Sequence, residues 1–344
     1  MKIGLVGYKN SGKSTLFEWL TGEIADVALA HTLQSTMTAI PEPRVDDLCK
    51  IYHPKKVTYA SLEIVDTPGL SRDQEGNAAR LAQLREVGCL ICIVPVFDGA
   101  DPEKEIRIFH EDLILADMEL VTNRITRILE QKKRPLPKPD QEKLAFELET
   151  LEMVQQALES GEPLRENELN DEQQKATRAF RLLSEKPRLL FFNTADDETD
   201  LGRFEHYATE KCPVITASIR LEKELAVMSP EEKTAFLEEM QLPCSDRDTI
   251  LRKILDASGQ MLFLTAGEKE VRTWLVRKNG TAVEAAAEIH TDMAKGFIRA
   301  EIMRCDDLVR LGSERALKAE NLVRREPKDY VIQEGEVVLF HFSG

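Results

Sequence analysis

Residues 2–17, KIGLVGYKNSGKSTLF, decide the fold of the first part of this 344-residue chain. An apolar run predicts a buried strand, and the next segment, GYKNSGKS from Gly7 to Ser14, fits the pattern G-x-x-x-x-G-K-[ST] in full. Glycines at these places let the backbone wrap around phosphate oxygens, and the N–H groups of the helix that follows attract the anion. Because the motif lies between a strand and a helix, we favour a phosphate-binding loop over a glycine turn with a stray lysine.

The residues of this loop have different expected roles. Lys13 would neutralise the β- and γ-phosphates, and the hydroxyl of Ser14 would bind magnesium. The residues expected to contact the nucleotide phosphates are Asn10, Ser11, Gly12, Lys13, Ser14 and Thr15. The loop alone does not say which nucleotide is bound, so other segments must supply that information.

The sequence DTPG, residues 66–69, ends a second apolar run and matches the D-x-x-G expected on the far side of the γ-phosphate. Asp66 would hold magnesium through water, and the N–H of Gly69 would sense the γ-phosphate. A tight turn is the alternative, since Asp, Pro and Gly are typical turn residues. With the phosphate-binding loop upstream we favour the functional interpretation, and Lys13 and Gly69 become the candidate catalytic groups.

The next two features concern hydrolysis and magnesium. Leu70 occupies the position where Ras-like GTPases carry the glutamine that orients the attacking water, so hydrolysis should be slow or use another group, for which Gln74 is a nearby candidate. The segment AHTLQSTMT, residues 30–38, offers four hydroxyls to magnesium, and its composition does not choose among Thr32, Ser35, Thr36 and Thr38.

The segment RLLFFNTADD, residues 188–197, is the candidate for base recognition. It places Asn193 at the carboxyl end of a buried strand, the edge where α/β sheets bind ligands. GTPases carry N-K-x-D here, whereas this chain has Asn193, Thr194 and Asp196, which keeps the guanine acceptor and loses the lysine. An asparagine that caps a solvated acidic run is the alternative. Ser218 ends the next strand and is placed to touch the base from below.

The arrangement of apolar runs predicts the architecture of the first two thirds of the chain. Five runs look like parallel strands separated by helical patterns, which predicts a doubly wound α/β sheet: residues 3–7, 61–66, 89–97, 188–193 and 213–218. The insertion between the third and fourth runs is too long for a loop. Its apolar spacing predicts two helices, 105–131 and 142–161, which we interpret as an antiparallel hairpin. The hairpin tip is basic, with a solvated turn as the alternative: Lys132, Lys133, Arg134 and Lys138.

The pattern changes at about residue 261, where short alternating runs surround one helical stretch. This pattern is typical of a small α+β domain of the β-grasp kind. We therefore predict a nucleotide-binding domain made of residues 1–98 and 188–260, a helical insertion of residues 99–187, and a C-terminal domain of residues 261–344.

The composition limits the partners. With 46 Lys+Arg against 61 Asp+Glu the net charge is −15, which excludes nucleic-acid binding by bulk electrostatics and confines any RNA contact to a local patch. The six cysteines are scattered, as expected in a reducing cytosol, and Cys89 and Cys92 lie in a predicted strand whose faces point them apart. No apolar run reaches a membrane-spanning length. We expect a soluble, cytoplasmic monomer that binds neither DNA nor a membrane.

With these segments assembled, the chain resembles the Obg-like ATPases, the YchF branch of the Obg GTPases, nearly from end to end. The segments that carry the resemblance are NSGKSTLF, PEPRVDDL followed by PKKV, LREV, EDLILADMELVTNRI and FLTAGEKEVRTWLVRKNGTAVEAAAEIHTDMAKGFIRAEI. The last block is similar to the TGS domain of that family. The resemblance implies a P-loop nucleoside triphosphatase that uses GTP or ATP with Mg²⁺. It also implies an inserted helical hairpin, a C-terminal TGS domain, and action in contact with the ribosome or ribosomal RNA.

The resemblance also implies roles for two residues. Thr32 is the closest match to the threonine that ligates magnesium in the family, and Asn10 matches the asparagine that can hold K⁺ in related Obg-class enzymes. Other positions depart from the family. Residues 193–196 read N-x-x-D where the family has N-x-x-E, which leaves the choice of base open. Residues 66–70 read DTPGL for D-x-A-G-L, and the shortened segment near residue 98 lacks a histidine found in many members, with His110 further on. These departures favour a divergent paralogue.

Two hypotheses of different classes follow. The first is a slow, magnesium-dependent NTPase that acts as a translation or stress switch on the ribosome. The second is a scaffold that binds RNA or protein, is stabilised by bound nucleotide and hydrolyses that nucleotide at a negligible rate. Leu70 and the missing histidine favour this second hypothesis. A metabolic kinase is disfavoured because the sequence shows no recognisable acceptor pocket.

Overall fold

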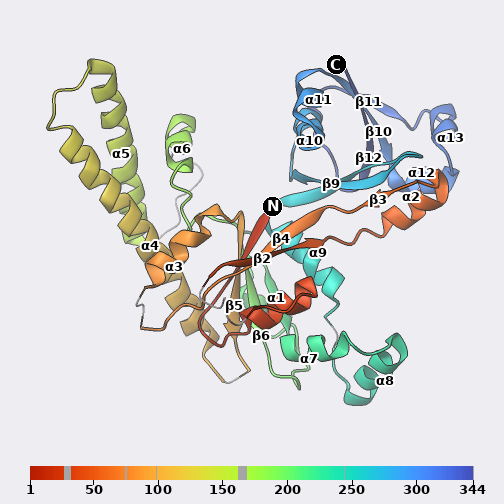
Figure 1. Ribbon diagram of the computed structural model, residues 1–344, viewed down its shortest axis with the longest axis horizontal. Helices are drawn as coiled ribbons and strands as arrows, with labels where there is room; N and C mark the ends of the chain where they lie inside the picture. Colours follow the sequence, from red (N-terminus) through yellow and green to blue (C-terminus); the bar gives the residue numbers. More distant parts are fainter. Residues whose placement is uncertain (27–31, 74–75, 98, 162–168, 244, 344) are drawn as a thin grey trace. The chain divides into compact units, whose positions relative to one another are not determined.

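The computed structural model describes residues 1–26, 32–73, 76–97, 99–161, 169–243 and 245–343 (Figure 1). The chain divides into two compact units, which are described separately here. Unit 1 contains Met1–Thr36 and Glu63–Ser245, and unit 2 contains Met37–Leu62 and Asp246–Gly344. This division by contacts differs from the three predicted domains, since it keeps the helical insertion in unit 1 and assigns residues 37–62 to unit 2. The three-domain organisation stays a prediction.

The sheet that contains the predicted phosphate-binding strand has six strands in the order β2-β4-β1-β5-β6-β7. Strand β1 pairs in parallel with β4 and β5, β5 pairs in parallel with β6, and β6 with β7. The strands are β1 (Lys2–Val6), β2 (Gln34–Ala39), β4 (Ser61–Asp66), β5 (Cys89–Pro95), β6 (Arg188–Asn193) and β7 (Val214–Ala217). The five predicted strands are confirmed, and the α/β fold with them. Strand β2 was missed because its Ser- and Thr-rich residues, at the sheet edge, read as a polar loop.

Helices connect these strands. The helices of unit 1 are α1 (Lys13–Thr21), α3 (Asn77–Ala82), η2 (Gln83–Glu86), α4 (Pro102–Gln131), α5 (Lys138–Ser160), α6 (Asp171–Arg178), η3 (Glu205–Tyr207), α7 (Ile219–Leu225) and α8 (Pro230–Met240). Helix α1 begins directly after the phosphate-binding loop and ends at Gly22, whose left-handed conformation stops the helix. The predicted order of strand, loop and helix around the motif is therefore confirmed.

Helices α4 and α5 form the predicted hairpin and run antiparallel, as Figure 1 shows. They share an apolar core with Leu169 and Leu182, which lie on either side of α6 in the chain. Arg124 on α4 donates two hydrogen bonds, of 2.7 and 2.8 Å, to Glu147 on α5. Helix α5 begins at Lys138, earlier than the predicted residue 142. Pro139 lies in the first turn of α5, where a backbone N–H would have no partner within the helix. A proline at this position therefore costs no hydrogen bond, and the helix can begin before it. Helix α6, which the sequence did not predict, begins with a capping box at Asn170.

The first half of α4 belongs to the core of unit 1. Phe109, Leu113 and Ala116 pack against the apolar cluster that the sheet presents on that side. The fully buried Asp117 accepts hydrogen bonds from the backbone N–H groups of Leu183 and Ser184, at 3.1 and 2.8 Å. The start of the hairpin is therefore attached firmly to the α/β core, since a buried carboxylate with several donors is costly to disrupt.

Unit 2 is built on a second, mixed sheet with the order β11-β10-β12-β8-β9-β3. Its strands are β3 (Val57–Thr58), β8 (Gln260–Thr265), β9 (Val271–Arg277), β10 (Phe297–Arg304), β11 (Arg324–Glu326) and β12 (Glu336–Phe342). Its helices are α2 (Arg44–Tyr52), α9 (Arg247–Ala257), α10 (Ala282–Ile289), α11 (Thr291–Lys295), α12 (Cys305–Leu311) and α13 (Glu314–Ala319). The predicted α+β pattern is confirmed for β8, β9, β10, β12 and α10, whereas β3 and β11 were not predicted. The further helices are short and were not predicted.

Residues 37–62 form an integral part of unit 2. Strand β3 pairs in parallel with β9, with Val57 opposite Val271. Helix α2 places Val45 and Leu48, both fully buried, in an apolar cluster with residues of β8, β9, β12 and α12. The sequence did not indicate this, because residues 40–60 precede the second strand of the nucleotide-binding motif and were assigned with it.

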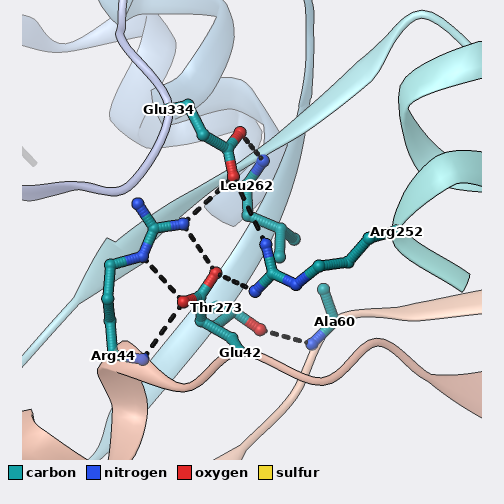
Figure 2. Close-up of polar contacts among 7 residues, drawn as sticks. All are labelled: Glu42, Arg44, Ala60, Arg252, Leu262, Thr273 and Glu334. Atoms are coloured by element: carbon teal, nitrogen blue, oxygen red, sulfur yellow. Dashed lines mark hydrogen bonds and ion pairs between the residues drawn. The ribbon is translucent and has the colours of Figure 1, made fainter. Parts of the chain in front are cut away.

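A buried ion network joins residues 37–62 to the rest of unit 2 (Figure 2). Glu42 is 3% exposed and accepts hydrogen bonds from the guanidinium groups of Arg44 and Arg252, each at 2.7 Å. Arg44 also contacts Glu334, which accepts a hydrogen bond from the N–H of Leu262 at 3.0 Å. Burial alone would raise the pKa of Glu42, but the two arginines outweigh it and lower the pKa below the usual value.

Among the described residues, no helix is long and apolar enough to span a bilayer. Cys89 and Cys92 are both buried in β5, and the described part of the chain holds no cluster of His, Cys, Asp and Glu that could bind a metal ion.

Candidate nucleotide-binding site

The phosphate-binding loop is closed by its lysine. The Nζ of Lys13, the first residue of α1, donates a 2.9 Å hydrogen bond to the carbonyl of Tyr8. Lys13 is 7% exposed, and burial lowers its pKa to about 8, against the opposing attraction of Asp66. A buried ammonium next to exposed loop residues is suited to a polyanionic ligand, which would supply the counter-charge that the site lacks.

Two positions in the loop require glycine. Gly12 has a φ of 100°, and a Cβ there would lie 2.5 Å from the Nδ2 of Asn193. A Cβ on Gly7 would lie 2.7 Å from the Oγ of Ser11 and 2.8 Å from the carbonyl of Ile93. The backbone therefore approaches its neighbours more closely than a side chain would allow, as a phosphate cradle needs.

The predicted magnesium ligands on α1 and β4 lie together. The hydroxyl of Ser14 donates a 2.7 Å hydrogen bond to Oδ2 of Asp66. The Oδ1 of Asp66 is buried and has no hydrogen-bond partner within the described chain. Burial raises the pKa of Asp66, although Ser14 and Lys13 act in the opposite direction. A hydroxyl and a carboxylate, one oxygen of which has no partner among the described residues, are hard ligands of the kind that Mg²⁺ prefers, so these two residues fit that ion.

The DTPG segment is attached to the loop through its backbone. The N–H of Leu70 donates to the carbonyl of Gly7 at 3.0 Å, and the N–H of Lys9 donates to the carbonyl of Leu70 at 3.1 Å. The hydroxyl of Thr67 donates to the carbonyl of Leu5 at 2.6 Å. Gly69 borders the head of the loop lysine, since a Cβ on Gly69 would lie 3.3 Å from the Nζ of Lys13. The two predicted catalytic groups are therefore neighbours.

Asn193, at the end of β6, connects the loop to the base-binding segment. Its Nδ2 donates to the carbonyl of Ser11 at 3.1 Å, and its Oδ1 accepts from the N–H of Ile219 at 3.2 Å. Both ends of the amide are thus engaged by the protein itself. The geometry gives Asn193 a bracing role, while direct contact with a base stays a prediction.

Asp196, the predicted guanine acceptor, has partners on both carboxylate oxygens. Ser218 donates to Oδ1 at 2.5 Å, and Arg220 forms a 2.8 Å ion pair with Oδ2. Thr194, which replaces the lysine of N-K-x-D, is 4% exposed, and its hydroxyl has no partner within the described residues. The sequence predicted Asp196 and Ser218 but missed Arg220, which stands two residues beyond Ser218 at the start of α7.

The structure says less about the other predicted site residues. Asn10 is exposed in the loop with a φ of 65°, and Thr15 is half-buried in α1. Thr32 is exposed and follows residues 27–31, which lie outside the described residues, so its contact with magnesium stays a prediction. Gln74, the candidate for orienting water, also lies outside the described residues.

A polar network beneath the loop escaped the sequence analysis. The hydroxyl of Tyr8 donates to Oδ2 of Asp112 on α4 at 2.9 Å, and the Nδ2 of Asn77 on α3 donates to the same oxygen at 2.9 Å. Asn77 also exchanges two 2.8 Å hydrogen bonds with the backbone of Ser71. Arg72 forms an ion pair with the buried Glu105 and lies over the ring of Tyr8. The network joins the loop, the segment after DTPG, and the base of the helical hairpin.

Comparisons with known proteins agree with this geometry. Residues 2–133 match the family model described as a 50S ribosome-binding GTPase. Residues 261–343 match the C-terminal YchF GTPase family, described as "Protein of unknown function (DUF933)". The first match covers the phosphate-binding loop and the DTPG segment. The second covers the sheet of unit 2 except β3 and the first residue of β8.

Whole-length relatives identify the family. The "Ribosome-binding ATPase YchF" of Bacillus subtilis (strain 168) is 34% identical, over 100% of this chain and 99% of the relative. "Obg-like ATPase 1" of Oryza sativa subsp. japonica is 33% identical, over 100% of this chain and 92% of the relative. The structure of the Schizosaccharomyces pombe YchF GTPase superposes with a TM-score of 0.80 and 26% identity, over 99% of this chain and 97% of that one. The sequence expectation is confirmed: this chain belongs to the YchF family of Obg-like ATPases.

Proposed function

We propose that this protein is a slow, Mg²⁺-dependent nucleoside triphosphatase that associates with the ribosome and acts as a nucleotide-controlled switch. The observation that carries the proposal is the meeting of Lys13, Ser14, Asp66 and Gly69, which come from two distant segments of the chain. The buried ammonium of Lys13 would bind phosphate, and the Ser14 hydroxyl with the Asp66 carboxylate would bind Mg²⁺. The Gly69 N–H would contact the γ-phosphate, and P-loop hydrolases use groups of these kinds for phosphoryl transfer.

Ser14 and Asp66 would hold Mg²⁺, with Thr32 as the further hydroxyl that the family resemblance implies. The ion would neutralise charge on the phosphate oxygens while Lys13 binds the β- and γ-phosphates. The resemblance also implies K⁺ beside Asn10, and a comparison of hydrolysis rates in KCl and NaCl tests that implication.

Ribosome association rests on the relatives. The Bacillus subtilis relative is named a ribosome-binding ATPase, and this chain aligns with nearly its entire length. A ribosome partner supports the proposal that the protein acts in the cytoplasm. The net charge of −15 means that a contact with ribosomal RNA must be local, as the basic hairpin tip or the C-terminal TGS domain would provide.

The choice of base is the least constrained part of the proposal. Asp196 carries a guanine acceptor, but Arg220 occupies one of its oxygens. The relatives are named ATPases, whereas the first family model is a GTPase. We therefore propose that ATP and GTP both bind, without the strong guanine preference that a free aspartate would give.

A scaffold with negligible hydrolysis is the alternative function. Leu70 supports it, because this apolar side chain, which is 2% exposed, cannot orient the attacking water. Co-sedimentation of the protein with ribosomes, with and without a non-hydrolysable nucleotide, separates the two functions. A switch requires that Lys13→Ala abolishes both nucleotide binding and the nucleotide-dependent part of ribosome association. Retained association, indifferent to nucleotide and to Lys13→Ala, would instead support the scaffold.

A further inference from the structure

This chain lacks the side chain that orients water in Ras-like GTPases, and its hydrolysis needs another source of transition-state stabilisation. Leu70, at the glutamine position, is buried and apolar. In phosphoryl transfer, charge spreads over the γ-phosphate oxygens, and a cation brought to them accelerates hydrolysis by about 10³–10⁵-fold in the enzymes that use an arginine finger. A cation with that role must lie beside Gly69, whose N–H faces the γ-phosphate in the proposed site.

The backbone of Lys9 is held at this place. The N–H of Lys9 donates to the carbonyl of Leu70 at 3.1 Å, and the residue before it, Tyr8, supplies the carbonyl that holds the Nζ of Lys13. The residue after it, Asn10, has a φ of 65°, which turns the chain sharply toward the start of α1. Lys9 therefore lies on the rim of the loop, between the loop lysine and the DTPG segment.

The side chain of Lys9 runs along Gly69. A Cβ placed on Gly69 would lie 3.1 Å from the Cγ of Lys9 and 3.2 Å from its Cα, while the Nζ of Lys13 would be 3.3 Å away. The stem of Lys9 and the ammonium of Lys13 thus border the same face of one glycine. A flexible lysine whose stem starts there can bring its own ammonium to the phosphate that Lys13 binds.

The charge of Lys9 is also available. Lys9 is exposed, and among the described residues its ammonium has no ion-pair or hydrogen-bond partner. Arg72, which follows the DTPG segment, is already paired with Glu105 and lies over the ring of Tyr8. In a chain of net charge −15, a lysine left without a carboxylate at the mouth of a polyanion site is well suited to bind the ligand.

We propose that Lys9 is a catalytic residue, a cationic finger built into the loop, which contacts an oxygen of the γ-phosphate. The inference rests on the proposed NTPase function and deepens it. In the reaction, the oxygen of water forms a bond to the γ-phosphorus while the bond from that phosphorus to the β–γ bridging oxygen breaks. The electron pair of the broken bond stays on the diphosphate, and the proton of water leaves with inorganic phosphate or to solvent. Lys9 stays protonated and acts only through its charge.

The test compares the full-length wild type with Lys9→Ala, Lys9→Gln and Lys9→Arg in single-turnover hydrolysis, alongside the Kd of a non-hydrolysable analogue. We expect Lys9→Ala and Lys9→Gln to slow hydrolysis at least tenfold with less than a threefold change in Kd, because the cation acts mainly on the transition state. Lys9→Arg, which keeps the charge, should recover most of the rate. Lys143→Ala is the matched control, since Lys143 is an exposed lysine on α5.

The outcomes separate the inference from the proposed function. A rate within tenfold of wild type for Lys9→Gln, or a loss that lies entirely in Kd, overturns the catalytic role and leaves the NTPase function intact. A wild-type protein that neither binds nor hydrolyses nucleotide contradicts the proposed function itself. The same measurements in KCl and in NaCl test whether Lys9 or a potassium ion supplies the positive charge at the γ-phosphate. If Lys9 supplies it, the wild-type rates in the two salts should agree within twofold. A rate more than tenfold higher in KCl would assign that charge to potassium.

Discussion

At the scale of single residues, the site depends on charges whose partners are incomplete without a ligand. Lys13 is buried with a lowered pKa. Asp66 is buried with a raised pKa, and one of its oxygens has no hydrogen-bond partner in the described part of the chain. The charged form of each side chain is less stable here than it would be in water. A magnesium–nucleotide complex would stabilise both charges, because its phosphates would pair with Lys13 and its metal ion with Asp66. The buried polar groups of the loop are therefore better explained by binding than by stability.

The pKa of Lys13 predicts how nucleotide binding depends on pH. Because the ammonium form binds phosphate, and the pKa in the free protein is about 8, affinity should be constant below that pH and fall by up to about tenfold per pH unit above it. The sign for folding is opposite: the unfolded chain binds more protons between about pH 8 and the usual lysine value, so stability of the free protein should rise there. Titration of a non-hydrolysable analogue from pH 7 to about 9.5 checks the first effect, and a pH-independent Kd would contradict it.

Arg220 predicts the choice of base. Guanine must compete with Arg220 for Oδ2 of Asp196, so the wild type should bind GTP and ATP within about tenfold of each other. Arg220→Ala should tighten GTP binding by up to about fivefold, since the competing ion pair is largely exposed and worth about 0–1 kcal/mol, and should leave ATP binding nearly unchanged. Competition of each nucleotide against a fluorescent analogue measures this. Equal weakening of both nucleotides would mean that Arg220 contacts the ligand directly instead.

At the scale of elements, the helical hairpin is connected to the nucleotide site through Asp112. This carboxylate on α4 accepts hydrogen bonds from Tyr8 of the loop and from Asn77 of α3, which in turn holds Ser71 just beyond DTPG. A movement of the DTPG segment would therefore act on the base of α4. The arrangement gives a physical route by which a hydrolase site and a projecting hairpin could respond together.

Removing Asp112 tests the connection. Asp112→Ala leaves the Tyr8 hydroxyl and the Asn77 amide without their buried partner, and should lower the free energy of unfolding of unit 1 by about 1–3 kcal/mol. It should also reduce the nucleotide dependence of proteolysis in the hairpin. Glu111→Ala is the control, because Glu111 is the exposed neighbour on the same helix. Indistinguishable denaturation curves for the two variants would remove the network from the account.

The sequence was sufficient for the elements that a local pattern of apolar residues, glycines or prolines defines. The strand before the loop, the helix after it and the hairpin follow from residues close in the chain, so periodicity and the glycine pattern predicted them. The pairs Ser14–Asp66 and Lys13–Gly69 were predictable because a known chemistry demands them. Arg220, Asp112 and Lys9 have no motif, and their roles depend on which distant residues fold beside them.

At the scale of the whole molecule, the chain passes between the two units three times. It enters unit 2 at Met37, returns to unit 1 at Glu63, and leaves again after Ser245. The first passage follows Thr32 and the second precedes Asp66, two of the proposed magnesium ligands. Residues 37–62 are thus anchored in unit 2 at Glu42 (Figure 2) and at α2. The backbone joins both of their ends to segments that carry residues of the nucleotide site.

The ion network at Glu42 predicts how unit 2 responds to acid. Glu42 has a lowered pKa in the folded protein, so its contribution to stability is present above its unfolded pKa and is lost as the pH falls through its folded pKa. Glu42→Gln should lower the stability of unit 2 by about 1–3 kcal/mol at pH 7, discounted for the partial exposure of both arginines, and flatten its acid dependence. The fluorescence of Trp274 in a Trp19→Phe background reports on unit 2. An unchanged acid profile would contradict the assignment.

Whether the loop binds a magnesium–nucleotide complex is measured by titrating the purified wild type and Lys13→Ala with fluorescent ATP and GTP analogues, in Mg²⁺ and in EDTA. The account predicts wild-type binding well below about 1 mM for both nucleotides, which is weakened by EDTA and lost in Lys13→Ala. Binding of neither nucleotide by the folded wild type in the presence of Mg²⁺, or equal binding by Lys13→Ala, would contradict it.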